Sequence, residues 1–123
     1  MSRLLELRQD IAGALASLDL NVYTHIPARM ALPGAFLAAG NPYIEQGQTF
    51  GERLVRFEVA IASQTGDNLS ETEALDRLIE SAQALLDAAG WTVEEVSQPY
   101  IQDFNNAAAL VTTFTVSTFE TFN

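Results

Sequence analysis

Strict alternation of side-chain character from Arg53 to Ser63 is the feature that most constrains how this chain can fold. The residues expected on one face are large and apolar, namely Val55, Phe57, Val59 and Ile61, and those expected on the other face are Arg56, Glu58, Ala60 and Ala62. A period of two residues belongs to a β-strand that buries one face. We therefore predict a strand here, in a sheet that is covered on one side.

Two segments instead have the three- and four-residue spacing of amphipathic helices. The first runs from Ser2 to about Leu18 and places leucine or isoleucine at positions 4, 7, 11, 15 and 18. The second opens with a capping-box sequence, Ser70-x-x-Glu73, and ends before Gly90. Its predicted buried stripe is Leu75, Leu78, Ala82, Leu85 and Ala89.

Further strands are predicted at Val22–Ile26, Ala35–Ala39, Trp91–Val96 and Ala109–Phe119. The order along the chain is then α-β-β-β-α-β-β. This order indicates an α+β fold with a mostly antiparallel sheet packed against two helices. Residues 1–123 suffice for a single domain that buries roughly two thirds of its extended-chain surface.

Two segments are candidates for contacts with other protein chains. Gly40–Glu52 has neither period, so we predict a loop, and loops of this length are usually functional. Its candidate contact residues are Pro42, Tyr43, Ile44, Gln48, Thr49 and Phe50. The predicted outward face of the last strand adds Val111, Thr113, Thr115 and Phe119, and Phe122 follows it. That strand is either a sheet edge that a partner covers, or a mid-sheet strand whose outer face lies under a helix.

The sequence lacks the side chains that most catalytic and cofactor sites require. The chain has no cysteine and no lysine, and its glycines do not form a phosphate-binding loop. His25 is the single histidine, and we expect it to be structural or exposed rather than a catalytic base. We predict no enzyme activity, no metal site and no cofactor.

Acidic side chains are concentrated in the second half of the chain. The net charge is −10, and residues 61–123 carry one arginine against ten acids, whereas residues 1–60 carry five arginines against six acids. Four of the acids, Glu71, Glu73, Asp76 and Glu80, belong to the polar side of the second helix. Because a grip on phosphates needs clustered cations, tight nucleic-acid binding is disfavoured. The acids form either a solvated face or a surface past which DNA slides.

The chain is expected to be cytosolic and to make no membrane contact. No window approaches the ~18 uninterrupted apolar residues that a membrane-spanning helix requires. The N-terminal leucines are interrupted by Arg3 and Glu6, unlike the apolar region of a signal peptide.

Several short segments carry a family resemblance. In order they are Val22-Tyr23 with Ile26-Pro27, Asn41-Pro42-Tyr43-Ile44, Gln48-Thr49-Phe50-Gly51, Val55 to Ile61, Ala74 to Ile79, and Trp91 to Tyr100. Together they cover nearly the whole chain and resemble the tail terminator, or tail completion, proteins of long-tailed, siphovirus-type bacteriophages, those of actinobacteriophages above all.

This resemblance implies a structural virion protein. The similar proteins form a hexameric ring on the head-proximal end of the tail tube, stop tube polymerisation and join the tail to the neck. The implied partners are further copies of the chain, the tail tube protein and a neck or head–tail connector protein, with DNA as a passing cargo and assembly in the host cytoplasm. The alternatives are another neck, head-completion or tail-tube-associated phage protein, or a small cytosolic binding domain unrelated to phage.

Overall fold

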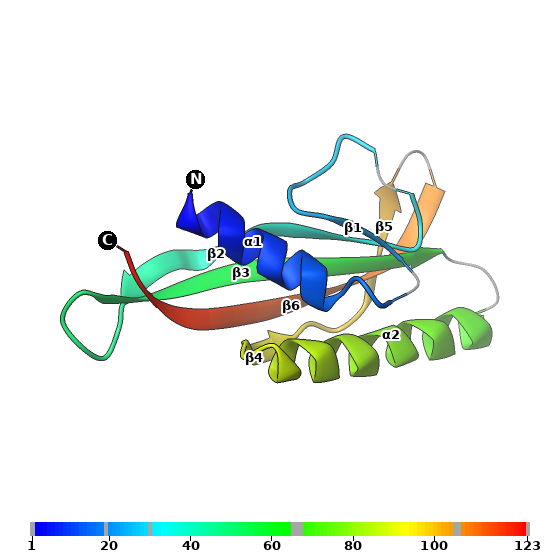
Figure 1. Ribbon diagram of the computed structural model, residues 1–123. Coiled ribbons are helices and arrows are strands. Elements are labelled where there is room, and N and C mark those ends of the chain that lie inside the picture. The colour runs from blue at the N-terminus through cyan, green and yellow to red at the C-terminus, as the bar shows by residue number, and fades with distance from the viewer. Residues whose placement is uncertain (1, 19, 30, 65–67, 105–106, 123) are drawn as a thin grey trace.

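The computed structural model describes residues 2–18, 20–29, 31–64, 68–104 and 107–122. Within these ranges the chain forms an α+β fold, in which a mostly antiparallel sheet packs against two helices (Figure 1). The elements are α1 (Arg3–Ala14), β1 (Asn21–Tyr23), β2 (Gly34–Gln46), β3 (Glu52–Gln64), α2 (Asn68–Ala88), β4 (Thr92–Val96), β5 (Tyr100–Phe104) and β6 (Ala107–Thr121). The predicted class is confirmed, while the predicted order lacks β5.

Strand β6 lies inside the sheet, whose order is β1-β2-β3-β6-β4. One side of β6 pairs with β3, and its other side pairs with β4 near its C-terminal end and with β5 near its N-terminal end. The possibility that β6 is a free edge is therefore wrong, because strands occupy both of its sides. The possibility of a helix over its outer face is also wrong. On that face Val111 packs in a small cluster with Ala60, Ala62 and Ala109, to which β1, β2 and the segment between them contribute Tyr23, Phe36 and Leu32.

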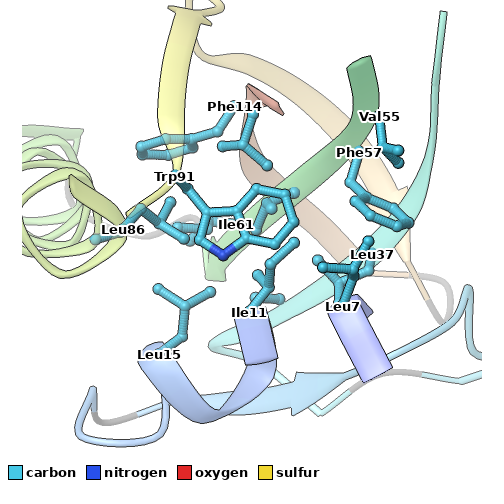
Figure 2. Packing of buried hydrophobic residues seen from close by; sticks show 14 of the residues in the cluster. Leu7, Ile11, Leu15, Leu37, Val55, Phe57, Ile61, Leu86, Trp91 and Phe114 are labelled. Carbon is cyan, nitrogen blue, oxygen red and sulfur yellow. The ribbon is translucent and has the colours of Figure 1, made fainter. Parts of the chain in front are cut away.

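Both helices cover the opposite face and enclose the main core (Figure 2). The four predicted core residues of β3, Val55, Phe57, Val59 and Ile61, are completely buried, which confirms the alternation. Helix α1 contributes Leu7 and Ile11, and Leu15 follows directly after it. Each is four residues, or about one turn, from the next, so the helical period brings them to one side.

Helix α2 ends in a Schellman motif that directs Trp91 into the core. Gly90, predicted as the cap, has a φ of +93°, and its N–H donates to the Asp87 carbonyl at 3.1 Å. The Trp91 N–H donates to the Leu86 carbonyl at 3.0 Å, and Figure 2 shows the two side chains together. The predicted stripe is confirmed at Leu75 and Ala82, but Leu86 is buried and Ala89 is exposed. The helix also begins at Asn68, two residues before the predicted capping box.

Strand β2 continues through most of the segment predicted as a loop. Residues 40–46 belong to the strand, and the connection to β3 is only residues 47–51. Ala39 opposes Phe57 whereas Ile44 opposes Val55, so β2 accommodates five steps where β3 makes two. Pro42 lies within this irregular stretch, where no paired N–H is required of it. The bulge hides the period of two, which explains why the loop prediction is wrong.

Candidate assembly surfaces

Exposed apolar side chains gather where the β2–β3 hairpin meets the C-terminal end of β6. We call Ile44, Phe50, Phe119 and Phe122 the hairpin end; Phe50 is fully exposed, at 103%, and the other three are between 39% and 46% exposed. The register joins these parts, since Glu52 opposes Thr121 and Leu54 opposes Phe119. Figure 1 shows the hairpin beside the C-terminus, at the end of the sheet opposite β5. Ile44 opposes Val55 whereas Phe119 opposes Leu54, so these two side chains point to opposite faces of the sheet, and the hairpin end is an apolar end of the sheet rather than one flat patch. Exposed large apolar side chains at one end of a domain are candidates for contact with another protein.

The structure brings most of the predicted loop residues to this end of the molecule. Pro42, Gln48 and Thr49 are exposed there. Within the turn, Gly51 has a φ of +84°, the Glu52 N–H donates to the Thr49 carbonyl at 3.1 Å, and the Glu52 carboxylate accepts from the Gln48 N–H at 2.8 Å. The turn is therefore tied together by its own hydrogen bonds and presents Phe50 outward.

Four of the predicted contact residues lie elsewhere. Tyr43 is half-buried, its ring packs edge-on against Phe57 at 5.5 Å between centroids, and its hydroxyl accepts from Arg8 Nη2 at 3.2 Å. Val111 is buried, and Thr113 and Thr115 are half-buried in mid-sheet. The prediction of a contact surface at Val111 is wrong, because neighbouring strands and the residues between β1 and β2 enclose it.

Acidic residues of α2 lie on its exposed side. Glu73, Asp76 and Glu80 are exposed, with Arg77 between them, while the side chain of Glu71 lies outside the described residues. Leu75 and Ala82 of the same helix face the core. The prediction that these acids belong to the polar side of the helix holds for the three described ones.

A cross-strand ion cluster lies on the helix-free face of the sheet and was not predicted. Arg56 of β3 is held between two acids, with Nη1 at 2.6 Å from Glu45 Oε1 and Nε at 3.0 Å from Glu94 Oε1. Partial burial would raise the pKa of Glu94, but hydrogen bonds from Ser117 and Arg56 and the charge of Arg56 outweigh it and lower the pKa. The cluster ties β2, β3, β4 and β6 together. Only the outward position of Arg56 was visible in the sequence, because its partners come from distant strands.

Glu94→Gln is expected to remove an acid-sensitive part of the stability. A carboxylate whose pKa is lowered by folding stabilises the folded state above its unfolded pKa, and this contribution disappears as the pH falls through the folded pKa. We expect a loss of less than about 1 kcal/mol at pH 7, which shrinks towards zero between about pH 5 and pH 3. Urea unfolding at several pH values measures the difference.

Glu95→Gln is the matched control, because the neighbouring Glu95 is exposed and has no ion-pair partner among the described residues. A pH-dependent loss of the same size in this control would contradict the assignment.

A groove of about 480 Å³ lies beside the outer edge of β2, between that strand, α1 and the residues that follow β1. It is lined by Leu5, Arg8, Thr24, His25, Ile26, Leu37, Ala38 and Ala39. Among the described residues, β1 pairs with β2 at Gly34–Phe36 and stops there. Beyond that point Leu37–Ala39 pair with β3 on one side, and the described residues place no strand on their other side. His25 is exposed at the rim, which is the exposed alternative of the prediction for this residue. The groove depends on where β1 stops, which no local pattern signals.

Arg8 closes the inner side of this groove. Its Nη1 donates to the Thr24 carbonyl at 3.2 Å, and its guanidinium carbon lies 5.1 Å from the centre of the Phe57 ring. In the described part of the chain no carboxylate lies within ion-pair distance of Arg8. The groove is thus lined mainly by apolar side chains and contains the Arg8 cation, for which the described residues supply no opposite charge.

Among the described residues, no three His, Cys, Asp or Glu side chains are grouped so that they could hold a metal ion. No helix in these ranges is long and apolar enough to cross a membrane. A scan against protein-family models matches none of them, and a search of curated proteins finds no significant match.

Proposed function

We propose that this chain is a structural virion protein, the tail terminator of a long-tailed phage. It forms a ring, expected to be hexameric, that caps the head-proximal end of the tail tube, stops its polymerisation and joins the tail to the neck. The proposal starts from the resemblance of the turn and strand segments to tail terminator proteins. The observation that carries it is the hairpin end, where four large apolar side chains are exposed at one end of the sheet.

A closed ring needs two different surfaces on each subunit, because every subunit contacts its neighbours head to tail. The hairpin end supplies one such surface. The groove beside β2 is a second surface with a different shape and chemistry. The hairpin end and the groove lie on different parts of the same chain. A heterologous contact requires two such different surfaces on each subunit.

The exposed acids of α2 fit a place along the path of the DNA. Glu73, Asp76 and Glu80 would present negative charge to a duplex that has to pass without being held. Whether α2 faces the DNA depends on how each subunit is oriented in the ring, and the ring itself does not depend on it. A reconstruction of the ring with α2 on its outer surface would remove it and leave the ring itself in place.

Native mass spectrometry of the purified protein, alone and with tail tubes of the same phage, tests the function. We expect a hexamer, or a monomer that becomes hexameric on the tubes, and electron microscopy should show the tubes capped at one end. As the matched variant, Phe119→Ser together with Phe122→Ser removes two of the exposed apolar side chains and should weaken capping. Ala84→Ser, on the exposed side of α2, is the control and should leave capping unchanged.

A protein that stays monomeric and ignores the tubes would overturn the proposal and favour a binding domain unrelated to phage. Binding at the neck without capping of tubes would favour a different head-completion protein.

A further inference from the structure

The groove beside β2 is open to solvent, and most of the side chains that line it are apolar. Its floor is Leu37 with Ala38 and Ala39, and two of its wall residues, Leu5 and Ile26, are 39% and 66% exposed although they are large and apolar. An edge with one strand beside it also offers backbone groups to an incoming segment. An occupant that covers these groups with an apolar side chain would bury surface that is now in contact with water.

The positive charge of Arg8 limits the kinds of segment that can bind in the groove. Arg8 is half-buried, and within the described residues its hydrogen bonds go to neutral oxygens, those of Thr24 and Tyr43. A cation in this position favours a segment that carries a carboxylate near its apolar side chain. The occupant should therefore combine an exposed aromatic or aliphatic residue with an acid within one or two positions of it in the chain.

The tip of the β2–β3 hairpin has this combination. Phe50 is the most exposed of the large hydrophobic side chains in the described residues, and Glu52 follows it by two positions. The tip cannot reach the groove of its own subunit, because the paired strands lead away from it. From Phe57, which opposes Ala39 at the groove, to Arg53 at the base of the tip, β3 advances four residues, or roughly 13 Å.

We propose that Phe50 of one copy of this chain inserts into the groove beside β2 of the next copy, with Glu52 near Arg8. The contact is heterologous, so its repetition closes a ring or extends a chain of subunits. This inference deepens the proposed function and rests on it for the number of subunits. It concerns a contact between copies of the chain, whatever they assemble on.

Cysteine cross-linking tests the contact directly, because the chain has no native cysteine. The double variant Thr49→Cys with His25→Cys keeps Phe50 and Leu5 in place and puts one thiol beside Phe50 on the tip and one at the rim of the groove. After mild oxidation, we expect a ladder of multimers on a non-reducing gel, since each subunit offers two different thiols. Either single variant should give little product, and Thr49→Cys with Ala84→Cys, on the exposed side of α2, should give no ladder.

Complementation gives a second readout that does not depend on disulfide geometry. Phe50→Ser and Leu5→Glu should each weaken self-association at least about ten-fold, the size expected for an anchor residue and its pocket. Mixed together, the two variants should form a heterodimer, because one supplies an intact groove and the other an intact tip. A mixture that stays monomeric would overturn the inference, as would efficient dimerisation of Thr49→Cys through its own thiol.

The two proposals fail in different ways. A ring that caps tubes but shows no cross-link between tip and groove would overturn the contact and leave the function standing. A specific cross-link ladder from a protein that neither caps tubes nor binds the neck would support the contact and overturn the tail terminator function.

Discussion

Phe57→Ala should lower the free energy of unfolding by about 3–5 kcal/mol, the usual range for removing a fully buried phenylalanine. The Phe57 side chain has no exposed surface, and its ring meets Tyr43 and Trp91 edge-on at centroid distances of 5.5 and 6.0 Å. Truncation also removes the ring beneath the Arg8 guanidinium, 5.1 Å away. Urea unfolding followed by circular dichroism measures the loss, which corresponds to a decrease in Tm of roughly 10–25 °C.

Phe50→Ala is the matched control because it removes the same atoms from a fully exposed position. Measured at a protein concentration where the chain is monomeric, it should change the free energy of unfolding by no more than about 0.5 kcal/mol. Equal losses in the two variants would contradict the described core. Phe50→Ala should nevertheless lose self-association. Stability is thus expected to depend on Phe57 and assembly on Phe50.

Gly40→Ala should destabilise the protein by about 1–3 kcal/mol, although alanine is normally the better residue in ordered backbone. A Cβ atom at position 40 would lie 2.5 Å from the Arg56 Cβ and 2.8 and 2.9 Å from the Arg56 carbonyl carbon and oxygen. These neighbours include backbone atoms of a central strand, so they cannot move without disturbing the bulge in β2. Thermal unfolding by scanning calorimetry measures the effect.

Gly13→Ala should stabilise the protein, although it is also a change from glycine to alanine. Gly13 lies within α1, and apart from the local backbone of the helix no described atom would come within 4 Å of its added Cβ. A gain of about 0.5–1 kcal/mol is expected, because alanine is favoured over glycine inside helices. A stabilising Gly40→Ala would show that β2 does not approach Arg56 as closely as described.

The sequence alone predicted the parts of the fold that depend on local periodicity. The burial of Val55, Phe57, Val59 and Ile61 follows from alternation in β3, and the packing of Leu7 and Ile11 follows from the spacing in α1. The end of α2 at Gly90 was predictable as well, because a positive φ strongly favours glycine. All four residues of the hairpin end were predicted as contact residues too, Ile44 and Phe50 within a loop rather than a paired hairpin, and Phe119 and Phe122 at the end of the last strand.

Features that depend on pairing between distant segments could not be predicted. The bulge around Pro42 ended the predicted strand at Ala39, whereas pairing with β3 carries β2 on to Gln46. The alternation in β6 gave no indication of whether β6 was an edge, because the same pattern suits an edge and a central strand. The partners of Arg56, namely Glu45 and Glu94, come from strands on either side of β3 and β6.

By itself, the sequence determined the α+β class, the two helices, the buried face of β3 and the absence of cysteine and lysine. Only the tertiary structure decided that β6 lies inside the sheet, that Phe50 stands at the tip of a hairpin and that a groove opens where β1 stops beside β2. The physical reason is that periodicity is set by neighbours along the chain. Strand order, edges and grooves are set by contacts between residues far apart in the sequence, and those contacts produce the surfaces on which assembly is proposed to depend.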